Sequence, residues 1–244
     1  MMSDNLNIPD DLVTRLLDAR RIAVLTGAGM SAESGIATFR DVSNGLWSQF
    51  DPRVLASPQG WANDRDLVWA WYEYRRAMVM KAQPNAGHFA IAQLANALQA
   101  AHGKEVEVNV ITQNVDDLHE RAGTTSVVHL HGSLFGPRCK ACGRPARDLP
   151  APSDVPVMKL RPPRCTHCNG YVRPGVVWFG EDLPKDAWRK AKAWVNDCDC
   201  LLVIGTSGVV WPAAQLPVDA QAKGKLVVEI NPHVIALRQS FCIP

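Results

Sequence analysis

The stretch "RIAVLTGAG", residues 21–29, contains a short apolar run that stops at Thr and Gly. Such a run is typical of a buried parallel strand that ends in a turn. Similar runs, each ending in Gly, Asn, Ser or Thr, occur as "VEVNVITQN" at 106–114, "LLVIGTS" at 201–207 and "LVVEINP" at 226–232. Helical segments are expected at 10–20, 85–101, 186–197 and 212–224. Alternating strands and helices predict an α/β fold with a doubly wound parallel sheet.

The composition excludes several classes of protein. The 244 residues suffice for one large α/β domain, and 47% apolar with 20% charged residues is typical of a soluble globular protein. A net charge of +2 gives no broad basic field for nucleic acid, and no apolar run reaches the roughly 18 residues that span a bilayer. The N-terminal stretch lacks the regions of a signal peptide. We expect a cytoplasmic monomer with neither a specific nucleic acid nor a membrane as partner.

Two segments interrupt the alternation of strands and helices. Residues 42–84 hold four of the eight tryptophans and no clear strand, which predicts a small helical insertion. Residues 136–175 are rich in Pro and Cys and have little periodicity, which predicts a second small module. The total of seven cysteines is odd, which argues against a disulfide framework.

The second module carries two C-x-x-C pairs, "CKAC" and "CTHC", separated by 22 residues. Each turn lets two thiolates reach one ion, and two turns complete a tetrahedral site. Cys139, Cys142, Cys165 and Cys168 are therefore predicted to hold one structural zinc ion, which a segment with few apolar residues needs in order to fold. A redox pair is the alternative, although one C-x-x-C would suffice for it. Four sulfurs leave no open position for catalytic zinc.

Polar residues follow each predicted strand, and doubly wound sheets bind their ligands at the carboxyl ends of strands. Gly27 and Gly29 would let the backbone turn sharply and present exposed amides to a phosphate. By itself, G-A-G fits an ordinary strand-to-helix turn equally well. Arg40, farther along the same polar stretch, could pair with a phosphate or with a neighbouring acid. The turn "GTS" at 205–207 can bind ribose or phosphate oxygens.

The strand predicted at 106–114 delivers Gln113 and Asn114 to its carboxyl end, with Asp116 just beyond them. Asp116 or Asp117 could simply cap the helix that begins there.

In "VVHLHGSLF", His129 and His131 alternate and would face opposite ways in an extended chain, so that one points into a cleft. His131, at the end of the strand, suits a general base at a ligand. A single buried histidine is otherwise usually a core residue.

Taken together, these motifs resemble the sirtuin family of NAD-dependent protein deacylases. The matching pieces occur in family order from residue 22 to residue 232: "GAGMSAESGIATFR", "TQNVDDLHERAG", "HLHG", the two C-x-x-C pairs, "RPGVVWFGE", "GTSGVVWPAA" and "EINP". The resemblance implies one catalytic domain over 1–244 with a Rossmann-like NAD-binding core. Within it, 42–84 would be the helical insertion and 136–175 the zinc-binding module, with the active cleft between core and modules.

The resemblance also implies roles for single residues. NAD would be bound by Gly27, Ala28, Gly29, Ala32, Thr38, Phe39, Arg40, Gln113, Asn114, Asp116, Gly205, Thr206, Ser207 and Asn231. His131 would be the catalytic base, together with Asn114 and Asp116. An extended segment would pair with the substrate backbone by strand addition, and it would consist of Val176, Val177, Trp178, Phe179, Gly180 and Glu181. Family members usually continue with a further helix and a strand-like segment, so we expect part of the adenine pocket to be missing or built differently here.

The implied reaction removes an acyl group from a protein lysine. The acyl oxygen attacks C1′ of the nicotinamide ribose, and nicotinamide leaves. His131 then deprotonates a ribose hydroxyl, which attacks the imidate carbon. Water finally releases lysine and O-acyl-ADP-ribose. Phe39 would shield the developing cation, and zinc takes no part.

The stretch "AWYEYRRAM", residues 70–78, bears on the choice of acyl group. Tyr72 and Arg75 share a face of a helix, where aromatic packing and a solvated or paired arginine are the simple interpretation. Class III sirtuins, which remove negatively charged acyl groups, carry Tyr-x-x-Arg here and a small alanine upstream, matched by Ala56. Arginine offers two donors to a terminal carboxylate, and tyrosine adds a third. We therefore expect a preference for succinyl-, malonyl- or glutaryl-lysine, with some deacetylase activity.

Other functions stay open at this point. The chain could be mainly a deacetylase or a protein ADP-ribosyltransferase. An NAD-binding module without turnover is disfavoured by the complete set of Asn114, Asp116 and His131. A nucleic-acid-binding zinc protein would use the basic side chains of the module, for which a solvated face is the simpler interpretation: Lys140, Arg144, Arg147 and Arg164.

Overall fold

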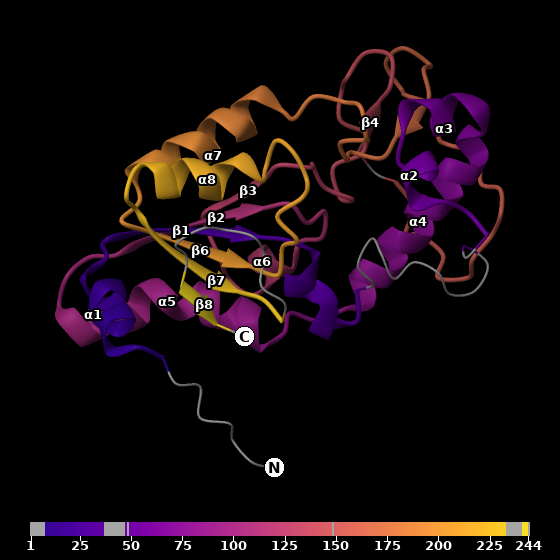
Figure 1. Ribbon diagram of the computed structural model, residues 1–244. Helices are drawn as coiled ribbons and strands as arrows, with labels where there is room; N and C mark the ends of the chain where they lie inside the picture. Colours follow the sequence, from indigo (N-terminus) through magenta and orange to yellow (C-terminus); the bar gives the residue numbers. More distant parts are fainter. Residues whose placement is uncertain (1–7, 37–46, 48, 148, 233–240, 244) are drawn as a thin grey trace.

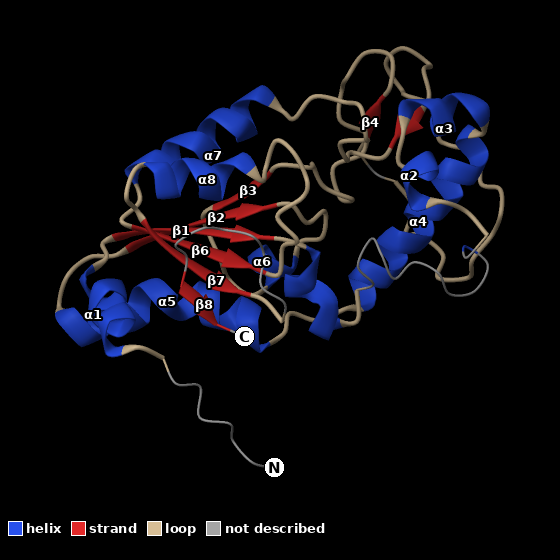
Figure 2. Ribbon diagram, in the orientation of Figure 1, coloured by secondary structure: helices blue, strands red, loops and turns tan. Residues whose placement is uncertain are grey.

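The computed structural model describes residues 8–36, 47, 49–147, 149–232 and 241–243 and arranges them in two lobes (Figure 1). The larger lobe contains a six-stranded sheet with helices on both faces (Figure 2). The smaller lobe contains the helical and cysteine-rich segments, which are far apart in the sequence but lie side by side. None of the described helices is both long and apolar enough to cross a bilayer.

The sheet is parallel throughout, in the order β3-β2-β1-β6-β7-β8. Its strands are β1 (Arg21–Thr26), β2 (Glu107–Thr112), β3 (Val127–His129), β6 (Cys200–Ile204), β7 (Leu226–Ile230) and β8 (Phe241–Ile243). β1 lies between β2 and β6, so the direction of winding reverses beside it, and Thr26 is aligned with Thr112 and Ile204. Ligands bind doubly wound sheets at this position. The predicted α/β sheet is confirmed, and β8 is a strand that the sequence did not predict.

Alternate side chains of β1 enter two different cores. The helices that cover the sheet are α7 (Lys185–Asp197) and α8 (Gln215–Ala222) on one face, and α1 (Asp10–Asp18) and α5 (Ala86–His102) on the other (Figure 2). Ala23 and Leu25 pack toward α7 and α8, whereas Ile22 and Val24 pack toward α1 and α5. Burial on both faces explains why the strand is a continuous apolar run.

The described residues between β1 and β2 are mostly helical. The helices are η1 (Ala28–Ser34), a 3-10 helix, α2 (Pro52–Leu55), α3 (Pro58–Asn63), α4 (Arg65–Lys81) and then α5. Asp51, Ser57 and Asp64 accept backbone N–H groups at the starts of α2, α3 and α4, which fixes where these helices begin. Trp61 and Trp71 are buried in the core of the smaller lobe.

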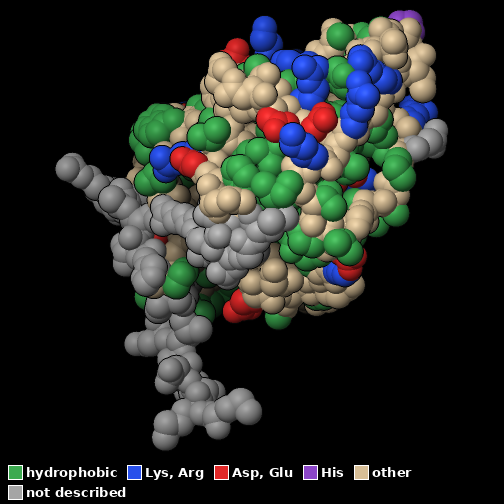
Figure 3. Space-filling view, turned by 90° about the vertical axis from the view of Figure 1, so that its right-hand side faces the viewer, with side chains coloured by type: hydrophobic (Ala, Val, Ile, Leu, Met, Phe, Trp, Pro, Cys, Tyr) green, Lys and Arg blue, Asp and Glu red, His purple; other side chains and the backbone are tan. Residues whose placement is uncertain are grey.

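The cysteine-rich segment is built on a two-stranded antiparallel ribbon of β4 (Arg138–Cys139) and β5 (Val172–Arg173). The chain between them packs against α4: Arg76 donates to the carbonyl of Pro150 at 2.9 Å, and the Leu160 N–H donates to that of Asp66 at 3.1 Å. Figure 3 shows this lobe in front, with Lys and Arg side chains gathered toward its upper edge. The exposed basic residues of the segment include Lys140, Arg144, Arg147 and Arg164.

Candidate active site

Four thiols gather in the smaller lobe. The Sγ atoms of Cys139, Cys142, Cys165 and Cys168 all lie within 4.8 Å of one another. Those of Cys139 and Cys168 are 3.4 Å apart and those of Cys142 and Cys165 are 3.8 Å apart, so each contact joins one C-x-x-C pair to the other. Tetrahedral Zn–S bonds of about 2.3 Å would separate the sulfurs by about 3.8 Å. The cluster therefore fits one structural zinc ion better than a redox pair within one turn.

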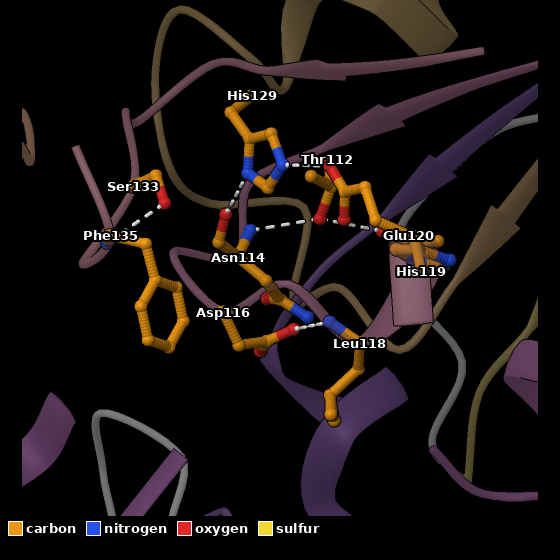
Figure 4. Close-up of polar contacts among 10 residues, drawn as sticks. Thr112, Asn114, Asp116, Leu118, His119, Glu120, His129, Ser133 and Phe135 are labelled. Atoms are coloured by element: carbon orange, nitrogen blue, oxygen red, sulfur yellow. Dashed lines mark hydrogen bonds and ion pairs between the residues drawn. The ribbon is translucent and has the colours of Figure 1, made fainter. Parts of the chain in front are cut away.

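Ser31, Asn114 and Asp116 form a buried polar group beyond the carboxyl ends of β1 and β2. Ser31 Oγ donates to Asp116 Oδ2 at 2.9 Å and accepts from Asn114 Nδ2 at 3.0 Å. Asp116 Oδ1 also accepts the first backbone N–H of α6 (Leu118–Arg121) at 3.2 Å (Figure 4). Asp117, the other candidate cap, makes no such bond. Asp116 therefore caps the helix and belongs to the polar group at the same time.

His131 follows β3, and its Nδ1 lies 3.0 Å from the carbonyl oxygen of Gln113. A carbonyl only accepts, so the neutral ring carries its proton on Nδ1 and leaves Nε2 able to take another. Burial lowers the pKa of His131, although the Gln113 carbonyl opposes this shift. The Gln113 amide donates to Thr206 Oγ1 at 3.0 Å and so joins the ends of β2 and β6. His131 thus has the tautomer and the charge of a general base.

His129, the alternative base, lies between two acceptors (Figure 4). Its Nδ1 is 3.0 Å from the carbonyl oxygen of Asn114, and its Nε2 is 2.7 Å from Glu120 Oε1. Burial alone would lower the pKa of His129, but the Glu120 carboxylate and the Asn114 carbonyl raise it. A ring that donates from both nitrogens has no lone pair for proton abstraction, so His129 instead ties β3 to α6.

Two more histidines, His88 and His119, are buried near the polar group of Ser31, Asn114 and Asp116. His88 Nδ1 accepts the backbone N–H at the N-cap of α5, and His119 Nε2 lies 3.1 Å from Thr26 Oγ1. The two ring centroids are 4.9 Å apart. Burial lowers both pKa values, that of His119 to about 4, so both rings are neutral near pH 7. Thr26 donates to Thr112 Oγ1 at 2.9 Å, which accepts the Asn114 N–H at 3.0 Å, so the chain of bonds reaches the polar group.

The two glycines after β1 pack against the end of β6. The Gly27 N–H donates to the carbonyl of Ile204 at 3.0 Å, and the Gly29 N–H donates to that of Gly205 at 2.8 Å. A Cβ at either position would lie 2.8 Å from backbone atoms of Gly205 or Thr206. The expectation that these amides are exposed is therefore wrong, because both are already bonded within the protein. The glycines are needed for the close approach of two loops.

The other residues predicted to bind NAD are spread along this edge. Ala28 and Ala32 are exposed on η1, and Ser207 is half-buried after β6. Asn231 is only 6% exposed, and its amide donates to Glu229 Oε1 at 3.1 Å, so this bond is made inside the protein at the end of β7. Three predicted residues, Thr38, Phe39 and Arg40, lie outside the described residues.

Tyr72 and Arg75 lie together on α4. Tyr72 is 3% exposed, and the Arg75 guanidinium carbon is 4.9 Å from the ring centre of Trp71 and 5.9 Å from that of Tyr72. Burial raises the pKa of Tyr72 to about 12, so its hydroxyl stays a donor. Burial lowers the pKa of Arg75, although Tyr72 and Asp116 oppose this shift. Ala56 is buried in the same core as Tyr72.

The segment 176–181 is extended in its first half. Val176 forms an antiparallel bridge with Gly132, and the Val177 N–H donates to the carbonyl of His131 at 2.8 Å. These contacts place the segment directly beside the candidate base.

The second half of the segment turns instead of continuing the strand. The chain reverses at Phe179 and Gly180, which has a φ of 86°. The expected extended form through Glu181 is wrong here, because the Glu181 carboxylate binds Arg173 and the Trp178 N–H inside the protein. The Trp178 side chain is 1% exposed, whereas that of Phe179 is 48% exposed.

Comparison with known proteins matches residues 27–212 to the family model described as "Sir2 family". The chain belongs to the Sir2 family. It is 51% identical over 230 residues to the NAD-dependent protein deacylase of Methylococcus capsulatus, covering 93% of this chain and 88% of that protein. NAD-dependent protein deacylase 1 of Pseudomonas aeruginosa is also 51% identical, over 229 residues, with coverages of 93% and 89%. A crystal structure of a Sir2 homolog–NAD complex shares the fold with a TM-score of 0.84 and 42% identity, covering 96% of this chain and 88% of that one.

The Sir2 site of this chain contains two side chains that sequence reasoning missed. Ser31 bridges Asn114 and Asp116, and its only signal was its place two residues after the G-A-G turn. Glu120 removes His129 from the candidates for the base, and its position three residues after Asp117 resembles that of any helix-surface acid.

Proposed function

We propose that this chain, an NAD-dependent protein deacylase of the Sir2 family, prefers lysine acyl groups that end in a carboxylate, such as succinyl, malonyl and glutaryl. The observation that carries the proposal is the placement of Arg75 on α4, half-buried beside the rings of Trp71 and Tyr72 and close enough to Asp116 to respond to its charge. A cation withdrawn from water favours an anionic ligand, which offsets its desolvation. Tyr72 adds a hydroxyl donor beside it, and the small side chain of Ala56 leaves room for the extra atoms.

We place NAD along the carboxyl edge of the sheet, next to η1 and the ends of β2, β6 and β7. The tightly packed glycine turn, the group of Ser31, Asn114 and Asp116, and the contact between Gln113 and Thr206 support this placement. When bound, NAD supplies the ribose carbon that receives the acyl oxygen as nicotinamide leaves.

The protein supplies the proton acceptor at this edge. His131, neutral and with Nε2 unprotonated, takes a proton from a ribose hydroxyl. Ser31 donates directly to Asp116 and is itself held by a bond from Asn114, so the polar surface of the pocket is preorganised.

Turnover of matched succinyl-lysine and acetyl-lysine peptides tests the acyl preference. We expect the wild-type chain to favour the succinyl peptide. Arg75→Met should lower kcat/KM for the succinyl peptide about a hundredfold and for the acetyl peptide less than about threefold. The reason is that the succinyl carboxylate loses its partner, whereas the acetyl group has no carboxylate to pair. Equal losses on both peptides would contradict the proposal, as would a wild-type preference for acetyl.

Arg76→Met is the matched control. Arg76 follows Arg75 on the same helix but pairs with Glu73 at 2.7 Å and with the carbonyl of Pro150, away from Tyr72. Its loss should leave the succinyl-to-acetyl ratio unchanged.

The products separate deacylation from ADP-ribosyl transfer. Labelled NAD incubated with an acylated protein yields O-acyl-ADP-ribose in the first case and labelled protein in the second. Label found mainly on protein would contradict the deacylase assignment.

A further inference from the structure

Arg173, at the end of β5, is one of the most enclosed charged side chains in the described structure, with 3% of its side chain exposed. Its Nη1 and Nη2 donate to the two oxygens of Glu181 at 2.5 and 2.9 Å. Nη2 also donates to the carbonyl of Val176 at 2.9 Å, and Nε donates to that of Pro174 at 3.2 Å. The guanidinium lies 3.4 Å from the ring centre of Trp178. One side chain thus contacts the start, the middle and the end of the segment 176–181.

Glu181 closes the turn from the other end. Its Oε2 accepts the backbone N–H of Trp178 at 3.0 Å, and its own N–H donates to the Trp178 carbonyl at 2.9 Å. These bonds leave Phe179 and Gly180 at the exposed tip of the turn. The shape of the turn is therefore set by contacts on its inner side, and its outer side stays accessible.

Two backbone N–H groups of the same segment are bonded to other parts of the site. The Val177 N–H donates to the carbonyl of His131 at 2.8 Å, and the Phe179 N–H donates to that of Ala56 at 2.9 Å. Neither bond involves Arg173, so its loss should change the shape of the turn more than the positions of His131 and Ala56.

We propose that Arg173 is a positioning residue for substrate binding: through Glu181, the Val176 carbonyl and the Trp178 ring, it holds residues 176–181 in the shape that receives the peptide on either side of the acyl-lysine. This rests on the proposed deacylase function and on the contact between that segment and the substrate backbone that the family resemblance implies. Arg173 does not touch substrate itself, since its guanidinium is enclosed by the turn. Trp178 and Glu181 act in the same way, through the shape of the turn rather than by contact with substrate.

Substrate length provides the test, because a peptide needs the segment whereas one acyl-lysine with blocked ends does not. For Arg173→Met we expect the KM of an acyl-lysine peptide of about ten residues to rise about tenfold, while that of the single blocked acyl-lysine changes less than about twofold. The KM for NAD should stay at its wild-type value, and kcat at saturating peptide should fall less than about threefold. A general structural defect would instead lower activity on the long and the short substrate alike.

Two milder variants keep the proposal testable if Arg173→Met folds poorly. Arg173→Lys keeps the charge without the two-pronged contact, and Glu181→Gln removes the charge of its partner. Both should raise the peptide KM selectively, by less than Arg173→Met. Arg76→Met is the matched control, because it also breaks a mostly buried Arg–Glu pair, but it should leave the ratio of peptide KM to single-residue KM unchanged.

Each variant is assayed with succinyl and with acetyl substrates. A selective rise in peptide KM with both acyl groups supports the role of Arg173 whether or not the wild type prefers succinyl. Equal effects of Arg173→Met on long and short substrates, or a wild-type KM for the long peptide in every folded variant, would overturn it.

Discussion

His129 and His131 are two residues apart, but their different surroundings give them different protonation states. Both contact a backbone carbonyl through Nδ1, His129 that of Asn114 and His131 that of Gln113. They differ at Nε2: Glu120 lies beside that of His129, whereas within the described part of the chain that of His131 has no hydrogen-bonding partner. The carboxylate helps to raise one pKa, and burial lowers the other. Only His131 keeps an unshared lone pair at neutral pH.

The lowered pKa of His131 predicts the acid limb of activity. The base works only when neutral, and a pKa below its ordinary value of 6.5 keeps it neutral to lower pH. We expect kcat/KM to hold at about pH 6.5 and to fall at more acidic pH, measured from about pH 5 to pH 8. Glu120→Gln should leave this limb in place, and His131→Ala should abolish turnover in a folded chain. A limb above pH 6.5, or turnover by a folded His131→Ala chain, would contradict the assignment.

At the scale of elements, the sheet and its covering helices could be predicted from the local pattern of apolar and polar residues. β1, β2, β6 and β7 are apolar runs because each is covered on both faces, and this pattern is visible in sequence. β8, in contrast, has three residues and gives no periodic signal. The turn at Phe179 and Gly180 escaped prediction for another reason: it depends on a long-range partner, Arg173, which sequence spacing does not reveal.

The same limit applies to the site. The resemblance predicted that the G-A-G turn, Asn114 and Asp116 serve one NAD site, and the contacts of Ser31 bring Asn114 and Asp116 next to that turn. It did not reveal that the Gly27 and Gly29 amides are bonded to the end of β6, since that depends on how two loops pack.

The contact between α5 and α6 should make stability depend on pH. Folded His119 takes up its proton near pH 4, whereas the unfolded chain does so near 6.5. The unfolded state therefore binds more protons between these values, and the folded state loses about 3 kcal/mol of stability as the pH falls through that window. His119→Gln keeps a donor for Thr26 but does not titrate. The unfolding free energy of the wild type minus that of His119→Gln should decrease from pH 7 to pH 4. A difference that stays constant over this range would contradict the prediction.

At the scale of the whole molecule, the two segments that interrupt the α/β alternation form one lobe. Arg76 of α4 reaches the carbonyl of Pro150, and Arg65 and Arg164 lie 4.6 and 3.6 Å from the ring centre of Tyr171. The helical segment therefore packs directly on the cysteine-rich one. We therefore expect the helical segment to lose structure when the cysteine-rich segment unfolds, and the reverse.

Removal of zinc tests this dependence. We expect one zinc ion per chain, and its chelation, or Cys142→Ser, should lower Tm and expose backbone amides of α4 to hydrogen exchange, since the cysteine-rich segment has little apolar core of its own. The amides of β1 should stay protected. A metal-free chain with unchanged Tm and a fully protected α4 would contradict both the structural role of zinc and the coupling of the two segments.

The path of residues 150–160 along α4 has a consequence for exchanging parts between relatives. This stretch meets the helix near both of its ends, through the Leu160 N–H on Asp66 and through an ion pair between Asp154 and Lys81. A chimera that takes only the metal-binding segment from a homologue would pack that segment against an α4 with which it does not match. Grafts should therefore take α4 and that segment together, and the acyl preference that we propose for Tyr72 and Arg75 should then be transferred with them.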